Sequence, residues 1–162
     1  MKSVLMSIRA IHNHNIESGL KKAELRTKAP NLETPFKVYT YESGIDGRHK
    51  VVNEWVCNNI KTWRMCMGIP AHLSSVACVS NEYIWDYCAR GKKEIYEMQI
   101  SDLKIYDKPK DLSEFKRAGY LTENEWLAYL YPNTHCHYDA WVKKFNIDGP
   151  PQNWCYVKSL FE

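Results

Sequence analysis

The stretch SGLKKAELR, residues 18–26, places a glycine turn directly before a short run of alternating charge. Its second half alternates as a strand does, and in a strand Glu24 and Arg26 point to the same face. Lys21 lies close enough to the turn at Gly19 to lean over that face. One carboxylate between two cations suits a phosphate, which the cations neutralise, or a base edge, whose amine donates to the carboxylate. The alternative is a ladder of surface ion pairs on an exposed strand.

The sequence on either side of this stretch predicts short strands, mostly joined by hairpins, with a few helices. Alternating or continuous apolar runs predict strands at 4–8, 21–27, 36–43, 49–60, 94–107 and 150–160. Helical spacing and capping signals predict helices at 9–18, 80–91 and 121–131. Strand–helix alternation is not sustained, which disfavours a doubly wound parallel sheet. We therefore expect an α+β fold, a small mixed barrel or curled sheet with helices packed on it.

The composition fits one globular domain over residues 1–162, with 44% hydrophobic and 25% charged residues. The net charge of +3 is too small to indicate nucleic acid by itself, although Lys and Arg concentrate at 21–28 and 90–93. No apolar run approaches the roughly 20 residues that span a membrane. The start MKSVLMSIRA also lacks the apolar region of a signal peptide. We therefore expect a cytoplasmic protein without a membrane partner, whose six cysteines are free thiols.

A second candidate carboxylate, Glu54, lies in the otherwise apolar strand VVNEWVC, residues 51–57. If it is buried, its pKa is raised, and it can act as a general acid or base or pair with Lys21 or Arg26. An outward-facing strand position explains it equally well, because the strand alternates.

Aromatic side chains are abundant, and those set among basic or polar residues are candidates to stack on bases. We select Tyr39 and Trp55 as candidate ligand-binding rings, with core and rim packing as the alternative for most of the set. Two His-x-His pairs, at 12–14 and 135–137, do not predict a metal site. On a helix i and i+2 do not face each other, and the later pair lacks a second ligand pair nearby. We expect no metal and no cofactor.

Several stretches taken together are similar to one known family. MKSVLMSI followed by SGLKKAELR resembles the start of ASCH domains, which belong to the PUA-like superfamily. That family is marked by Gly-x-Lys-x-x-Glu-x-Arg, and all four positions are present here in Gly19, Lys21, Glu24 and Arg26. Similarity to bacterial and phage ASCH-type proteins continues in KAPNLETPFKVYTYES, QISDLKIYDKPKDLSEF and PPQNWCYV. It is weak over 61–79 and 118–147, so we expect a family-variable insertion at 118–147.

The resemblance implies a PUA-like mixed β-barrel flanked by helices, with a cleft lined by the motif that binds RNA or a nucleotide. In that cleft Lys21 and Arg26 would hold phosphate or carbonyl oxygens, and Glu24 would accept from an amine. Tyr39 or Trp55 would stack on a base. The first hypothesis is therefore a binding module whose partner is RNA, a nucleotide or a modified nucleobase.

Two other functions stay open. Some ASCH relatives are hydrolases of RNA or of N4-acylated cytidine nucleosides, and Lys21 matches the catalytic lysine of the latter type. Glu24 occupies the place of that type's threonine, and Glu54 is the candidate for its glutamate. The third hypothesis is a regulatory module that contacts a protein partner through the aromatic-rich segment 118–147.

Overall fold

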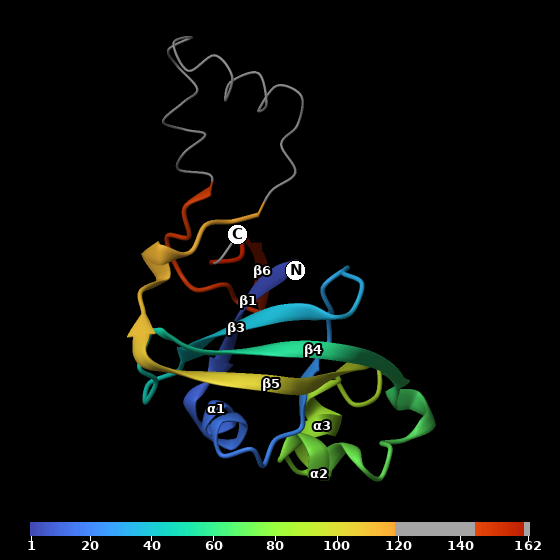
Figure 1. Ribbon diagram of the computed structural model, residues 1–162. Coiled ribbons are helices and arrows are strands. Elements are labelled where there is room, and N and C mark those ends of the chain that lie inside the picture. The colour runs from blue at the N-terminus through green and yellow to red at the C-terminus, as the bar shows by residue number, and fades with distance from the viewer. Residues whose placement is uncertain (119–144, 161–162) are drawn as a thin grey trace, which may run out of the picture.

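Six strands form one curled sheet in the spatial order β2-β5-β4-β3-β1-β6 (Figure 1). The computed structural model describes residues 1–118 and 145–160. β1 and β3 run parallel, and the other neighbouring pairs are antiparallel, which confirms the prediction of a mixed, curled sheet. The strands are β1 (Ser3–Arg9), β2 (Ala23–Arg26), β3 (Phe36–Ser43), β4 (Val51–Arg64), β5 (Glu94–Lys110) and β6 (Trp154–Val157).

Within residues 1–118, three short α-helices gather at one end of the sheet, whereas the N-terminus and β6 lie at the other (Figure 1). α1 follows β1 directly and stops before Gly19, whose φ of +73° is a conformation that favours glycine. The side chain of Ser80 caps α3 by accepting from the backbone amide of Tyr83. The helices are α1 (Ala10–Glu17), α2 (Leu73–Ala77) and α3 (Asn81–Tyr87), with single 3-10 turns η1 (Met65–Met67) and η2 (Leu112–Glu114).

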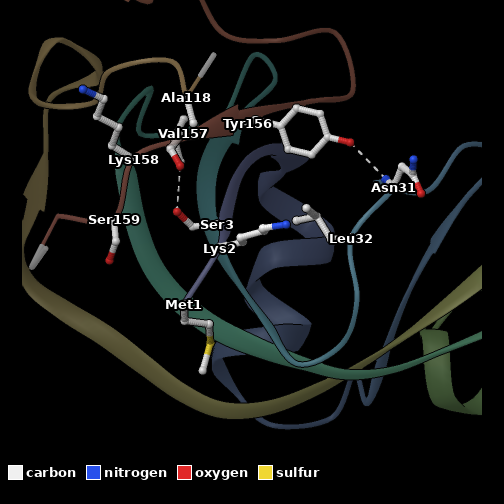
Figure 2. Close-up of a pocket in the computed structure, with 10 residues that line it drawn as sticks. All are labelled: Met1, Lys2, Ser3, Asn31, Leu32, Ala118, Tyr156, Val157, Lys158 and Ser159. Atoms are coloured by element: carbon white, nitrogen blue, oxygen red, sulfur yellow. Dashed lines mark hydrogen bonds between the residues drawn. The ribbon is translucent and has the colours of Figure 1, made fainter. Parts of the chain in front are cut away.

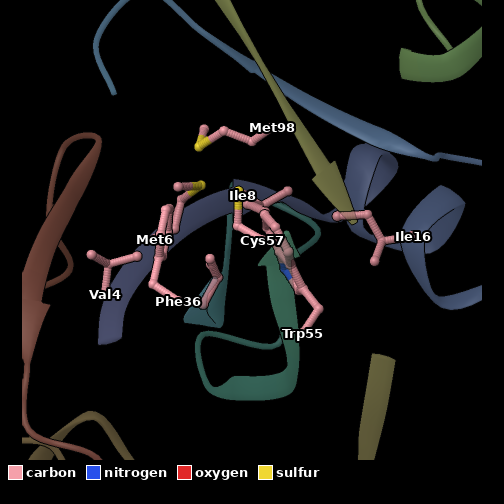
Figure 3. Packing of buried hydrophobic residues seen from close by; sticks show 9 residues of the cluster. Val4, Met6, Ile8, Ile16, Phe36, Trp55, Cys57 and Met98 are labelled. Atoms are coloured by element: carbon pink, nitrogen blue, oxygen red, sulfur yellow. The ribbon is translucent and has the colours of Figure 1, made fainter. Parts of the chain in front are cut away.

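β1, β3 and the first half of β4 are buried on both faces, so their alternating side chains contribute to two different clusters. The cluster inside the curl, drawn in Figure 3, comprises Val4, Met6, Ile8, Ile16, Phe36, Val38, Trp55, Cys57 and Met98. A second cluster lies on the opposite face of β1, β3 and β4 and comprises Leu5, Tyr39, Tyr41, Val51, Phe115, Ile147 and Val157. A third lies beneath α2 and α3 and includes Leu25 of β2.

The loop between β2 and β3 joins the two edge strands of the sheet. The indole of Trp154 in β6 donates to the carbonyl of Lys28 at 3.2 Å. The backbone amide of Asn31 donates to the hydroxyl of Tyr156 at 3.0 Å. Since β2 and β6 stand at opposite ends of the sheet order, these bonds close the curl into a barrel. The barrel is therefore closed by hydrogen bonds between the β2–β3 loop and side chains of β6.

Several element boundaries differ from the prediction, among them those of β4 and α3. β4 continues to Arg64, so the first part of 61–79, for which the pattern predicts no element, extends the sheet. α3 ends at Tyr87, short of the predicted end at 91. The residues that follow, Ala89 and Arg90, have positive φ and cannot continue a right-handed helix.

β5 contains a bulge next to Ser101. Asp102 has a φ of +47°, and the pairing of β5 with β4 changes register between Glu54 and Val56. The predicted helix at 121–131 lies outside the described residues, as does nearly all of the expected insertion.

Candidate functional site

The carboxylate of Glu24 lies between the two cations of the motif, and we call Lys21, Glu24 and Arg26 the ion triad. Glu24 Oε2 is 3.2 Å from Lys21 Nζ, and Glu24 Oε1 is 2.8 Å from Arg26 Nε. The side chains of Lys21, Glu24 and Arg26 are only 3%, 8% and 10% exposed. The alternative of an exposed surface ladder is therefore wrong, because the three charges form a buried cluster.

The register of β2 explains this burial. Glu24 pairs with Met98 of β5 and Arg26 pairs with Tyr96, so both charged side chains share the face of Met98. Met98 belongs to the cluster inside the curl, whereas Leu25 packs beneath α2 and α3 on the other face. The ion triad therefore lies at the helix-covered end of the barrel interior.

The two cations also connect β2 to three other parts of the fold. Lys21 Nζ donates to the carbonyl of Ala77 at the end of α2, at 2.8 Å. Arg26 donates to the carbonyl of Ser7 in β1 at 2.7 Å and to Oδ1 of Asn153, just before β6, at 2.8 Å. The ion triad is thus a junction that holds the helix-covered end together, and Arg26 bridges the edge strand β2 to β1.

The ion triad carries one net positive charge, because two cations share one carboxylate. Burial alone would raise the pKa of Glu24, but Arg26 and then Lys21 outweigh it and lower that pKa below its ordinary value. Glu24 is therefore ionised at neutral pH. Burial and then Lys21 lower the pKa of nearby His12, so the imidazole is neutral at neutral pH and adds no charge.

Three rings form an aromatic strip beside the ion triad: His12 of α1 with Tyr83 and Tyr87 of α3. The ring centroids of His12 and Tyr83 are 5.7 Å apart, and Tyr83 stacks on Tyr87 at 6.0 Å with the planes inclined by 15°. Burial raises the pKa of Tyr87, although the charge of Arg26 opposes it. Lys21 links the ion triad to the helices of the strip. Its backbone amide donates to the carbonyl of Asn15 in α1 at 2.8 Å, and its Nζ donates to the carbonyl of Ala77, three residues before the Ser80 cap of α3.

The two rings expected to stack on a base, Tyr39 and Trp55, are both 0% exposed, which corrects that expectation. Trp55 lies inside the curl and donates its indole N–H to Thr40 Oγ1 at 3.1 Å. Tyr39 lies in the cluster on the opposite face, with its ring edge-on to Phe115. Because β3 and the first half of β4 are covered on both faces, alternation in these strands separates two cores and does not expose one side.

Glu54 is also buried, but its contacts are separate from the ion triad. Its Oε1 is 3.1 Å from Nζ of Lys37, and its Oε2 accepts from the hydroxyl of Tyr106 at 2.6 Å. It pairs in register with Tyr39, on the face away from the barrel interior. The expected pairing of Glu54 with Lys21 or Arg26 is therefore wrong among the contacts of the described residues.

Two cavities stand out in the described residues, and neither is lined by the ion triad. The larger, about 670 Å³, lies where β1 starts and includes Lys2, Tyr156 and Lys158 in its lining (Figure 2). The second, about 340 Å³, lies between Trp63 and Pro70. The ion triad instead contacts Ser7, toward the end of β1. The motif is thus a nearly enclosed cluster that lines neither cavity, which differs from the expected cleft lined by the motif.

The described residues hold no group of three or more His, Cys, Asp or Glu side chains placed to bind a metal ion. The later His-x-His pair at 135–137 lies outside them. The cysteines in this part of the chain, at 57, 66, 78, 88 and 155, are free thiols. Within residues 1–118 and 145–160, no helix is both long and apolar enough to cross a bilayer.

The sequence does not predict the aromatic strip as a whole, although the spacing of two of its rings indicates that they lie together. Tyr83 and Tyr87 are four residues apart in a predicted helix, a spacing that places two side chains on one face. The contact of that face with His12 is not indicated by the sequence, because it depends on how the fold brings α1 and α3 together. Asn153, which holds Arg26, is equally remote in the sequence.

No family model matches the chain, and no curated protein matches it in sequence. Its structure is similar to the crystal structure of the ASCH protein from Zymomonas mobilis, with a TM-score of 0.65 at 16% identity, covering 98% of this chain and 89% of that one. A serine-to-alanine mutant of that protein gives the same score and identity over 98% and 90% of the two chains. A tyrosine-to-phenylalanine mutant gives 0.64 at 15% identity over 99% and 93%. The chain therefore shares the α+β fold of this ASCH protein.

Proposed function

We propose that this chain binds RNA or a nucleotide on the surface above the ion triad. The observation that carries the proposal is the net positive charge of that cluster, in which two buried cations share one buried carboxylate. A buried charge without a counter-charge is costly. A phosphate group bound at the adjacent surface supplies the missing counter-charge.

Coulomb's law gives the scale of this attraction. A unit anion about 6 Å from a unit excess charge gains roughly 3 kcal/mol at an effective dielectric constant of about 20. Arg9 is exposed at the end of β1, and its charge reaches His12 of the aromatic strip. A bound phosphate would contact Arg9 at the surface. It would also be attracted by the buried positive charges of Lys21 and Arg26. Dissolved salt screens this attraction, so the binding is expected to weaken as the salt concentration rises.

The complete motif and the ASCH fold support RNA or a nucleotide as the class of ligand. Glu24 contributes by holding Lys21 and Arg26 in place, because each of its oxygens already faces one cation and its side chain is nearly enclosed. This role differs from the expected contact between Glu24 and a ligand amine. Regulatory contacts through 118–147 would involve residues almost entirely outside those described.

The test is a fluorescence-anisotropy titration of a short single-stranded RNA at low salt, with Arg9→Glu as the variant. Arg9 is exposed, so reversing its charge changes the surface without cutting the buried junction. We expect roughly tenfold weaker binding, the effect of losing a favourable charge contact and adding a repulsive one. Lys108→Glu, the same change at an exposed position near the far end of β5, is the matched control and should bind as the unaltered protein does.

Absence of RNA binding at low salt would contradict the proposal, and so would equal losses in the two variants. Equal losses would mean that the protein attracts RNA only through its overall charge. A hydrolytic function has no comparable support, because Lys21 and Glu54, the residues expected to carry it, have separate partners.

A further inference from the structure

We propose that Tyr83 is a platform on which an unpaired nucleobase stacks, so that the ligand above the ion triad is single-stranded RNA. This inference rests on the proposed function and deepens it. The ion triad accounts for attraction to a phosphate, which every nucleic acid carries. The aromatic strip adds a surface for the base.

The ring of Tyr83 is both accessible and held in place. Tyr83 is 44% exposed, although it lies beside two other rings. Tyr87 covers one side in a stacked arrangement, and the ring of His12 leans against it at an interplanar angle of 60°. Neighbours from α1 and α3 thus orient the ring before a ligand arrives. A preorganised ring loses little conformational freedom on binding, which favours stacking.

The other exposed aromatic side chain of α3, Trp85, has a packing role instead. Trp85 is 38% exposed, and its ring lies against Gly91, where an added Cβ would come within 2.8 Å of the indole Cη2. Two residues along a helix are separated by about 200° around its axis. Trp85 therefore faces away from the aromatic strip and provides a matched control on the same helix.

Single-stranded RNA is the ligand that these two features fit together. In a duplex the faces of the bases are covered by their neighbours, so a tyrosine stacks only on an unpaired base. Lys21 of the ion triad is hydrogen-bonded to α1, which carries His12, and to the end of α2 just before α3, which carries Tyr83. The phosphate-attracting charge and the exposed ring are thus adjacent, as the phosphate and the base of one nucleotide are. Because every base offers a flat face, this arrangement binds without strong sequence preference.

The experiment compares three variants on three RNAs of equal length by fluorescence anisotropy: oligoadenylate, an abasic ribose-phosphate strand, and a duplex. Tyr83→Leu should weaken oligoadenylate binding roughly tenfold or more, and Tyr83→Trp, which keeps a ring, should restore it. Trp85→Leu should leave it unchanged. The abasic strand should bind more weakly than oligoadenylate and equally to the unaltered protein and to Tyr83→Leu. The duplex should bind more weakly than the single strand.

The outcomes separate this inference from the proposed function. If Tyr83→Leu binds oligoadenylate as tightly as the unaltered protein, or if the abasic strand binds as tightly as oligoadenylate, stacking on Tyr83 is overturned while phosphate binding stands. If no RNA binds the unaltered protein, both proposals fall. A 2-aminopurine base in the strand gives an independent readout. Its fluorescence should be quenched by the unaltered protein and by Tyr83→Trp but not by Tyr83→Leu, and quenching that persists with Tyr83→Leu overturns the inference.

Discussion

Glu24 and Glu54 are both buried carboxylates of the same sheet, yet their surroundings differ. Glu24 faces two cations, Lys21 and Arg26, at the helix-covered end of the barrel. Glu54 contacts Lys37 and the hydroxyl of Tyr106 on the opposite face of the sheet, and its cross-strand neighbour in β5 is a third residue, Lys104. Glu24 therefore lies between two buried cations, whereas the cation that contacts Glu54, Lys37, is partly exposed.

The difference distinguishes the cluster that we propose attracts a ligand from one that makes contacts within the fold. A single buried ion pair contributes through the contacts it makes within the fold. A cluster with excess charge adjoining an accessible surface attracts a counter-ion from solution. Burial of a carboxylate in a strand is therefore a poor guide to function, and the number of its buried charged partners is a better one.

The largest expected effect is that of Glu24→Gln on stability. The substitution leaves Lys21 and Arg26 buried without their shared carboxylate, and removing one partner of a buried pair costs about 3–5 kcal/mol. Glu54→Gln should cost less, roughly 1–3 kcal/mol, because Lys37 is partly exposed and the side-chain oxygen of glutamine can still accept from Tyr106. Urea unfolding of both variants measures the two free energies. An equal or larger loss for Glu54→Gln would remove the distinction between the clusters.

Arg26→Lys separates the structural role of the ion triad from its charge. Lysine keeps the positive charge but not the planar group that reaches Ser7 and Asn153 together. We expect the free energy of unfolding to fall by about 1–3 kcal/mol and RNA affinity to change less than about threefold. Unfolding and anisotropy measurements on one preparation give both quantities. An affinity loss as large as that of Arg9→Glu would show that the guanidinium itself contacts the ligand.

Tyr106→Phe tests the cluster around Glu54 with a smaller change. Burial, assisted by Glu54, raises the pKa of Tyr106, so its hydroxyl stays protonated and donates to the carboxylate. Loss of the Tyr106 hydroxyl should lower the free energy of unfolding by about 1 kcal/mol. RNA affinity should be unchanged, and a measurable change in the anisotropy titration would mean that the two clusters are coupled.

The smallest expected effect concerns pH and His12. Burial and then Lys21 lower the pKa of His12 below its ordinary value of 6.5. The unfolded chain therefore takes up a proton at higher pH than the folded chain does. Stability contributed by this group is full above about pH 6.5 and is lost as the pH falls toward the folded-state pKa. His12→Gln should make the free energy of unfolding fall less between pH 7.5 and 5.5. Parallel curves for the two proteins would argue against the shifted pKa.

The sequence predicts much of the fold because the relevant signals are local. Alternation and turn residues place β1 and β3 closely, and the spacing of Lys21, Glu24 and Arg26 predicts one carboxylate between two cations. Local alternation does not reveal whether the second face of a strand is covered. That is why Tyr39 and Trp55 are expected at a surface and lie in two cores.

The remaining parts of the site depend on contacts between distant segments. The hydrogen bond by which Arg26 helps to hold the barrel together is made to Asn153, 127 positions later. The aromatic strip needs α1 and α3 to meet, and neither helix predicts the other. Such pairings follow from how the sheet curls, which no short window of sequence encodes.

The comparison of the two carboxylates is tested most directly by an NMR titration of the isotope-labelled protein with single-stranded RNA, following the backbone amides. We predict that the largest shifts fall at His12, Tyr83 and Tyr87 and at the ion triad, while the amides of Glu54 and Tyr106 stay unmoved. Shifts centred on Glu54, or on the cavity beside Lys2 and Lys158, would contradict the assignment of the binding site to the positively charged cluster.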